Sequence, residues 1–230
     1  MSDGLQMKII ARIYNDFPTK FGIPRQSALA AELDSTIVFE PEYRDPNALR
    51  EIEQFSHLWL IWQFSESVQA EWSPTVRPPR LGGNRRIGVF ATRSPFRPNP
   101  IGLSAVQLLE VVRDPKCGHV LRVCGADLMN GTPILDIKPY VPFTDSLSEA
   151  SGGYTNETIQ HKLLLNFPQP LLQQVPAEKR LGLCRVLEQD PRPSYQDDPK
   201  RTYGFRFADM EIFFRVSGAT LTVTDIRHKS

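Results

Sequence analysis

The sequence predicts a mainly β protein, with a β-barrel-like N-terminal domain that carries a short helix and a small α+β C-terminal domain. Proline occurs 20 times in 230 residues. Long helices cannot dominate such a chain, because proline removes a hydrogen-bond donor and clashes inside a helix. Short runs of β-branched and aromatic residues alternate with turn residues, which favours a barrel or closed sheet over an alternating βαβ fold.

A change of composition after about Ser146 predicts the domain boundary. The segment SEASGGYTNET, residues 148–158, is small, polar and glycine-containing, as linkers are. We therefore expect a barrel domain over 1–147, a linker over 148–160 and a C-terminal domain over 161–230. The chain length suits one main domain with a smaller second one.

The elements expected in the first domain are mostly strands. HLWLIWQF, residues 57–64, is continuously apolar and predicts a buried strand. Leu49, Ile52 and Phe55 have helical spacing behind Asp45 and Pro46, which predicts a short amphipathic helix over 46–55. The other expected strands are 8–14, 35–39, 87–91, 104–112, 120–124 and 134–137. We expect 104–112 and 120–124 to form an antiparallel pair joined by a turn at 114–118.

The C-terminal segment predicts one helix and a small antiparallel sheet. Pro176 opens a helical pattern over 176–189, in which Leu181, Cys184 and Leu187 share one face. Apolar residues then alternate with polar ones over 203–207, 212–216 and 221–223, as in half-buried strands.

Composition and missing motifs exclude several classes of protein. The formal net charge is +1 and 40% of residues are hydrophobic, which is typical of a soluble globular chain. We see no apolar stretch long enough to span a bilayer and no secretory signal, so we expect a cytoplasmic protein without membrane contact. The three cysteines have no metal-ligand spacing and predict no metal site. No G-x-G-x-x-G, P-loop or G-x-S-x-G pattern occurs, which disfavours a Rossmann cofactor site and a serine hydrolase.

One segment has a strong local charge. No acidic residue occurs between Glu71 and Glu110, whereas the same stretch holds six arginines. Arginine binds phosphate and carboxylate through its planar fork, so this segment indicates a contact with nucleic acid. The alternative is a set of surface arginines paired with carboxylates from elsewhere in the chain. The candidate RNA-binding residues are Arg77, Arg80, Arg85, Arg86 and Arg97, with Arg93 as the sixth arginine.

Three segments gather polar groups that could perform chemistry. RIGVFATRSPFRPNPIGLS, residues 86–104, is a proline-stiffened loop that suits preorganised polar groups, although an irregular barrel corner would look similar. GIPRQS, residues 22–27, is a shorter loop with one arginine. ADLMNGTPILDIKPYVPF, residues 126–143, offers Asp127, Asn130, Asp136, Lys138 and Tyr140.

These segments resemble a known family. GVFATRSPFRPNPIGLS, with the upstream RPPRLGGN and FSHLW and the downstream NGTPILDIKPYVPF, is similar to the TrmO family of tRNA methyltransferases, and DPRPSY resembles the C-terminal extension of its bacterial members. The resemblance covers nearly the whole chain. It implies a homodimeric β-barrel enzyme that uses S-adenosylmethionine. The implied substrate is a tRNA anticodon arm with N6-threonylcarbamoyladenosine just 3′ of the anticodon, methylated on N6.

The resemblance also implies which residues contact the cofactor. Relatives often have His-Gln where this chain has Ser65-Glu66, and many have Asp where it has Asn130. Replacing Asp by Asn removes a charge near the cationic sulfonium. The implied cofactor contacts are Pro24, Arg25, Gln26, Ser65, Glu66, Arg93, Leu103, Asp127, Leu128, Met129 and Asn130.

Catalytic roles follow from the chemistry of that substrate. The nitrogen of a urea-like N6–H has a delocalised lone pair, so the enzyme must remove the proton as the methyl arrives. We expect Asn99 and Tyr140 to orient the urea and Asp136 to accept the proton; the alternative for Asp136 is a strand-end carboxylate paired with an arginine. Arg93 or Arg97 could bind the threonyl carboxylate through two parallel hydrogen bonds.

Two other classes of function remain open at this stage. A non-catalytic RNA-binding β-barrel would use the same arginine loop and would not bind S-adenosylmethionine. A small-molecule hydrolase would use Asp127 or Asp136, would need no methyl donor and would be insensitive to RNA.

Overall fold

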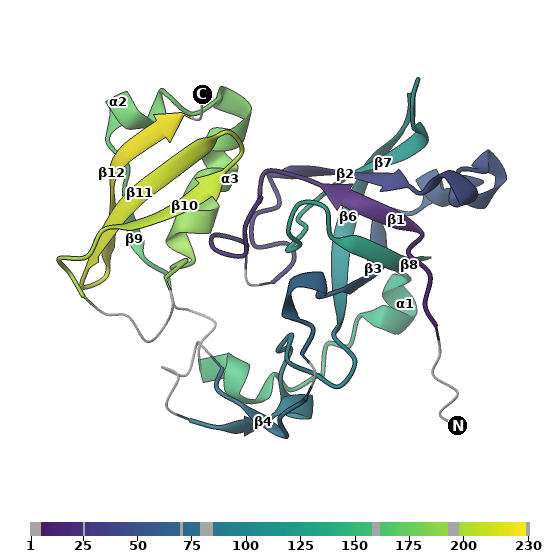
Figure 1. Ribbon diagram of the computed structural model, residues 1–230, viewed down its shortest axis with the longest axis horizontal. Coiled ribbons are helices and arrows are strands. Elements are labelled where there is room, and N and C mark those ends of the chain that lie inside the picture. Colours follow the sequence, from purple (N-terminus) through teal and green to yellow (C-terminus); the bar gives the residue numbers. More distant parts are fainter. Residues whose placement is uncertain are drawn as a thin grey trace.

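Six strands close into a barrel in the computed structural model, which describes residues 6–24, 26–69, 71–78, 85–157, 162–192 and 198–228. Their order is β1-β2-β7-β6-β3-β8, and β8 pairs with β1 to complete the ring (Figure 1). All neighbours in the ring are antiparallel. The barrel strands are β1 (Ala11–Tyr14), β2 (Asp34–Phe39), β3 (His57–Gln63), β6 (Ile101–Asp114), β7 (Gly118–Cys124) and β8 (Pro133–Pro139).

The barrel interior follows the period of two in its strands. In β3, Leu58, Leu60 and Trp62 are buried while the residues between them are partly exposed. Gly102 of β6 faces the Trp62 indole so closely that a Cβ would lie 2.2 Å from it. Only glycine fits there, so this pair fixes how β6 crosses β3.

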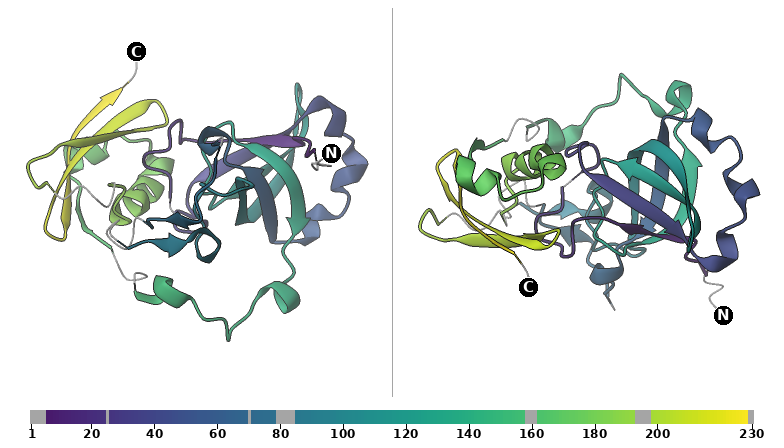
Figure 2. Two further views of the ribbon diagram at one scale, coloured as in Figure 1. Left: turned by 60° about the horizontal axis from the view of Figure 1, so that its bottom comes forward. Right: turned by 90° about the horizontal axis from the view of Figure 1, so that it is seen from above.

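A separate four-stranded sheet forms the C-terminal unit. Its order is β10-β11-β12-β9, with β9 parallel to β12 and the other pairs antiparallel. Both views of Figure 2 show this unit beside the barrel. Phe205, Phe207 and Phe214 pack with Leu183 and Leu187 of the helix in one core. The predicted fold class, mainly β with a small α+β second part, is confirmed. The elements are β9 (Leu164–Asn166), α2 (Gln169–Leu172), α3 (Ala177–Glu188), β10 (Tyr203–Phe207), β11 (Met210–Ser217) and β12 (Thr220–His228).

The loop between β1 and β2 joins the two units. Phe17 and Leu33 of this loop are buried in the core of the C-terminal sheet, although they precede the barrel strands β2 and β3 in sequence. Asp16 also forms an ion pair with Lys179 of α3. The β1–β2 loop is therefore held by both units. The division into 1–147, 148–160 and 161–230 stays a prediction.

The predicted helix over 46–55 is wrong. Two 3-10 turns, η2 (Pro46–Leu49) and η3 (Ile52–Gln54), stand in its place. The start was predicted correctly, since the Asp45 carboxylate accepts the Asn47 N–H at 2.9 Å. Glu51 has a φ of 67°, which ends the first turn, and both Leu49 and Ile52 still pack against the barrel core.

The predicted strand over 87–91 is also largely wrong. Only β5 (Ile87–Gly88) is a strand, paired with β4 (Thr75–Val76), and Val89–Ala91 forms the 3-10 turn η6. The buried Val89 donates its N–H to the Pro74 carbonyl at 3.0 Å, which turns the chain away from the sheet. The remaining short elements are η1 (Pro41–Tyr43), η4 (Ser65–Ser67), α1 (Pro142–Asp145) and η7 (Gly153–Glu157).

None of the helices in the described part of the chain has the length and apolar character needed to cross a membrane.

Candidate functional site

The end of β1 is tied to the segment after β7. The Asn15 backbone N–H donates to Asn130 Oδ1 at 2.9 Å, and the Asn15 side chain donates to the Leu128 carbonyl at 2.8 Å. The Asn130 N–H donates to the Phe17 carbonyl at 2.8 Å. These bonds hold residues 127–130 against the β1–β2 loop. Asn130 thus has a structural role in addition to the cofactor contact expected for it.

A chain of side-chain hydrogen bonds reaches Asp127 from inside the barrel. Trp62 Nε1–H donates to Ser104 Oγ at 3.0 Å, and Ser104 Oγ–H donates to Asp127 Oδ1 at 2.5 Å. Ser104 is only 1% exposed. Burial raises the pKa of the Asp127 carboxyl above its usual value, and the hydrogen bond from Ser104 opposes that rise. Ser104 fixes the orientation of this carboxylate.

Arg93 and Gln26 stand next to that carboxylate. Arg93 belongs to the loop between β5 and β6, here called the arginine loop. Its Nη1 donates to Gln26 Oε1 at 2.6 Å, which joins the arginine loop to the β1–β2 loop. The positive charge of Arg93 lowers the pKa of Asp127, although by less than burial raises it. Pro24, two residues before Gln26, is buried. The structure therefore brings together three of the expected cofactor residues, Gln26, Arg93 and Asp127.

Ser65 and Glu66 are exposed and belong to η4, directly after β3. Lys20 of the β1–β2 loop donates to the Glu66 carbonyl and, at 3.2 Å, to Ser67 Oγ. The Phe64 N–H donates to the Pro100 carbonyl at 2.8 Å, which places η4 beside the end of the arginine loop. The same two loops thus hold η4 and Asp127.

Two expected cofactor residues have side chains away from Asp127. The Leu128 side chain is fully buried in the barrel core, so only the backbone of Leu128 is left for the expected cofactor contact, which stays a prediction. Leu103 is 55% exposed and lies on the outer face of β6, opposite to Ser104. The Met129 carbonyl accepts the Thr132 hydroxyl at 2.6 Å and so closes the turn after 127–130.

The three expected catalytic residues are not brought together within one chain. Asn99 precedes Pro100, which bonds to Phe64 beyond the end of β3. Tyr140 donates its N–H to the His57 carbonyl at the start of β3 and packs against Trp59, with ring centroids 5.4 Å apart. The seven residues of β3 lie between these two ends of the strand, which are about 20 Å apart. Tyr140 therefore cannot act with Asn99 on one small group in the same chain.

Asp136 lies between those ends, on the outer face of β8. It is opposite Ile61 of β3, whose other neighbour is Leu103. Its carboxylate forms an ion pair with Lys138 at 3.0 Å and accepts the Ile137 N–H at 2.9 Å. The partner is a lysine of the same strand rather than an arginine.

The arginines flank the β4–β5 pair and continue along the loop behind it. Arg77 follows β4, Arg85 and Arg86 precede β5, and all three are exposed. Within the described ranges, no ion pair joins Arg77, Arg85, Arg86, Arg93 or Arg97 to a carboxylate. Arg97 Nη1 donates to the Thr92 carbonyl at 2.7 Å and so braces its own loop. Arg25 and Arg80 lie outside the described residues.

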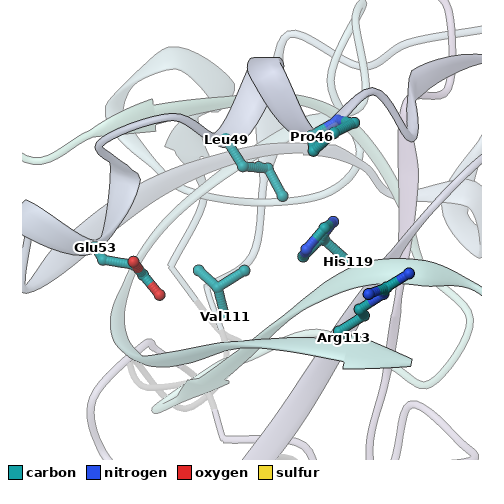
Figure 3. A pocket seen from close by; sticks show the side chains of 6 residues that line it. All are labelled: Pro46, Leu49, Glu53, Val111, Arg113 and His119. Atoms are coloured by element: carbon teal, nitrogen blue, oxygen red, sulfur yellow. The ribbon is translucent and has the colours of Figure 1, made fainter. Parts of the chain in front are cut away.

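A hollow of about 270 Å³ occurs elsewhere on the barrel, between η2, η3 and the strands β6 and β7. Figure 3 shows its lining side chains, which include Glu53, Arg113 and His119. None of the candidate residues lines it. In the part of the chain that the structure describes, no group of three His, Cys, Asp or Glu side chains is placed to hold a metal ion.

Sequence reasoning missed Asn15, Lys20, Trp62 and Ser104, which hold the site together. Ser104 was detectable in principle, because it is a polar residue at an inward position of an otherwise apolar strand pattern. Asn15 and Lys20 gave no signal, since polar residues in a loop are ordinary.

Comparisons with known proteins identify the family. The model of the tRNA-methyltransferase O N-terminal domain matches residues 12–146, and that of the TrmO C-terminal domain matches residues 161–229. A tRNA (adenine(37)-N6)-methyltransferase from Escherichia coli K12 is 41% identical over 226 residues, which cover 95% of this chain and 96% of that protein. A relative from Pseudomonas aeruginosa, named as an S-adenosylmethionine-dependent methyltransferase, is 39% identical over 88% of this chain and 89% of its own length.

A crystal structure of TrmO from Pseudomonas aeruginosa is similar to the structure of this chain, with a TM-score of 0.74 and 31% sequence identity. It covers 97% of this chain and 99% of that one, so the barrel and the C-terminal sheet both match. With both family domains found in order and a relative similar over almost the whole length, the chain belongs to the tRNA-methyltransferase O family.

Proposed function

We propose that this chain transfers a methyl group from S-adenosylmethionine to N6 of threonylcarbamoyladenosine, the nucleotide just 3′ of the anticodon in tRNA. The coarser activity, methylation of adenine in tRNA with S-adenosylmethionine as donor, is that named for its relatives. The threonylcarbamoyl group is the finer part of the proposal.

The observation that carries the proposal is the half-buried Asp127 carboxylate, held by the buried Ser104, near the Arg93–Gln26 pair. S-adenosylmethionine supplies an electrophilic methyl group on a sulfonium, and it bears both cationic groups and a carboxylate. A buried carboxylate favours a cationic partner, and an arginine with a free face favours an anionic one. Asp127, Arg93 and Gln26 therefore fit the two charge types of this cofactor.

The arginine-rich loop supports the RNA part of the proposal. Arg77, Arg85 and Arg86 are exposed and form no ion pair with a carboxylate of the described residues, so these three are available to phosphates. An anticodon loop can present an unstacked base to a pocket, which a duplex cannot. In the proposal Asn99 orients the urea group and Asp136 accepts the N6 proton. Asp136 would first have to be released from Lys138.

Arg97 carries the proposed preference for the modified nucleotide. We expect Arg97→Ala to discriminate less between threonylcarbamoyladenosine and unmodified adenosine, because a guanidinium pairs with the threonyl carboxylate. The measurement is the ratio of kcat/KM values on tRNA with and without the modification. Arg97 also braces its loop through the Thr92 carbonyl, so Arg97→Lys serves as the control that keeps a charge. An unchanged ratio in Arg97→Ala would contradict this assignment.

We also propose that the chain works as a homodimer in the cytoplasm. Ile101 and Leu103 are large apolar residues exposed on the outer face of β6, as expected where another protein surface packs. We expect sedimentation equilibrium to give about twice the 26.1 kDa of one chain. A mass of one chain at micromolar concentration would contradict the dimer.

Methyl transfer from labelled S-adenosylmethionine to two tRNA pools tests the reaction. One pool carries threonylcarbamoyladenosine and the other lacks it. We expect incorporation into the first pool alone. Incorporation into neither pool, with the cofactor still bound, would mean that the substrate is wrong. No cofactor binding would favour the alternative, a non-catalytic RNA-binding barrel.

A further inference from the structure

Two large aromatic side chains are exposed next to each other beside the arginines. Phe90 is 73% exposed and Trp72 is 50% exposed, and their ring centroids are 6.1 Å apart with 30° between the ring planes. Exposed apolar surface of this size is costly in water and is usually covered by a binding partner. None of the roles assigned above uses either ring.

The backbone holds Phe90 in a fixed place. Phe90 is the middle residue of η6; it follows Val89, which is buried, and precedes Ala91, which is exposed. The Val89 N–H bonds to the Pro74 carbonyl at 3.0 Å, and the Thr92 hydroxyl bonds to the Val89 carbonyl at 2.9 Å. Trp72 comes from the segment just before β4, so the β4–β5 pair brings the two rings together. A ring that is exposed but fixed loses little entropy when a partner stacks on it.

The charge around the rings selects the partner. Arg85 and Arg86 precede β5, Arg77 follows β4, and Arg93 lies three residues beyond Phe90. No acidic residue occurs between Glu71 and Glu110. Aromatic rings among unpaired arginines suit single-stranded nucleic acid, in which bases stack on the rings and phosphates meet the cations. A protein partner with an apolar surface would not need this excess of positive charge.

We propose that Phe90, supported by Trp72, is a stacking platform for an unpaired base of the RNA substrate. This proposal rests on the proposed function and adds a contact with a base other than the one that is methylated. The Asp127–Arg93 site remains the cofactor site, so loss of the platform leaves cofactor binding intact. Stacking tolerates any base, which means that the platform raises affinity for the loop without reading its sequence.

Binding of a fluorescein-labelled anticodon stem-loop RNA to the full chain tests the platform. We expect Phe90→Ala to raise the dissociation constant by about 5- to 100-fold, the range for loss of one base–aromatic stack. Phe90→Leu should weaken it similarly, because leucine is apolar but has no π face, and Phe90→Tyr should bind as the wild type does. Phe143→Ala is the matched control, since Phe143 is 88% exposed in α1 and is not flanked by this arginine segment.

Each outcome decides the proposal. The platform is supported if Phe90→Ala and Phe90→Leu lose RNA affinity while their affinity for S-adenosylmethionine, measured by calorimetry, is unchanged. Wild-type RNA affinity in either variant would overturn it, as would a change in oligomeric mass in Phe90→Ala, because the ring would then pack against a second copy of the chain. If the wild-type chain itself binds no RNA, the proposed function fails together with the platform. RNA binding and methylation that are insensitive to Phe90 reject the platform alone.

Discussion

Replacing Asp127 by Asn is expected to weaken S-adenosylmethionine binding by about 10- to 100-fold. The substitution keeps the shape of the side chain and an oxygen that accepts the Ser104 hydroxyl, but it removes the negative charge. Hydrogen bonds to charged groups contribute about 1.5–3 kcal/mol, which corresponds to this range. Calorimetric titration with S-adenosylmethionine measures the effect.

The pH dependence of the same variant gives an independent test. Burial raises the pKa of Asp127 in the folded chain, so the ionised form, and with it cofactor affinity, increases as pH rises through that pKa. Affinity in Asp127→Asn should lack this step. Asp209→Asn removes an exposed carboxylate from the turn between β10 and β11 and should leave the pH profile as it is in the wild type.

The stability of Asp127→Asn is expected to change in the opposite direction from its cofactor affinity. A raised pKa means that the folded state binds the proton more tightly than the unfolded state. The stability gained from that proton is present below the unfolded pKa and is lost as pH rises through the folded pKa. Above that folded-state pKa the wild type carries a half-buried charge, and Asp127→Asn should there unfold at a higher temperature than the wild type. The difference should shrink as pH falls through the pKa; a Tm of Asp127→Asn that stays below that of the wild type as pH rises would contradict the role of burial.

The strands were predictable because the hydrophobic pattern of a strand is set by which of its faces is buried, and this pattern is visible without knowing the strand's partner. HLWLIWQF predicts a strand, and β3 occupies its first seven residues. The segment 46–55 shows where this reasoning stops. Leu49 and Ile52 have helical spacing, yet two separate turns bury them as well, and nothing local distinguishes the two solutions. The left-handed conformation of Glu51 separates the two turns, and Leu49 and Ile52 on either side of it pack against the barrel core.

The candidate site was predictable only in its charged members. Arg93 and Asp127 were found because charge and family resemblance both indicate them. The family resemblance gave Leu128 as a cofactor contact, but a sequence does not tell that the side chain of Leu128 turns into the core and leaves only its backbone for that contact. Tyr140 was grouped with Asn99 by residue type. Only the register of β8 on β3 shows that they lie at opposite ends of a strand.

Gly22→Ala is expected to have the largest effect on stability, because Gly22 lies where the β1–β2 loop packs on the C-terminal sheet. A Cβ at Gly22 would lie 2.2 Å from the buried Phe205 ring of β10, and its φ of 93° is unfavourable for alanine. Overpacking costs about 1–3 kcal/mol and the left-handed backbone about 1 kcal/mol more. For a chain of this size, about 2–4 kcal/mol lowers the Tm by roughly 5–15 °C. Differential scanning calorimetry measures it.

The same substitution should also weaken cofactor binding, although Gly22 is in the loop and Phe205 is in the other unit. The loop is fixed at Phe17 and Gly22 on the C-terminal side and at Gln26 on the barrel side, so a shift at Gly22 moves Gln26 away from Arg93. Gly218→Ala is the control, since its φ of 56° is also positive, within the left-handed region, and no atom lies within 4 Å of the new Cβ. If Gly22→Ala loses no more stability than Gly218→Ala, or binds S-adenosylmethionine as tightly as the wild type, then the C-terminal sheet does not position the cofactor loop.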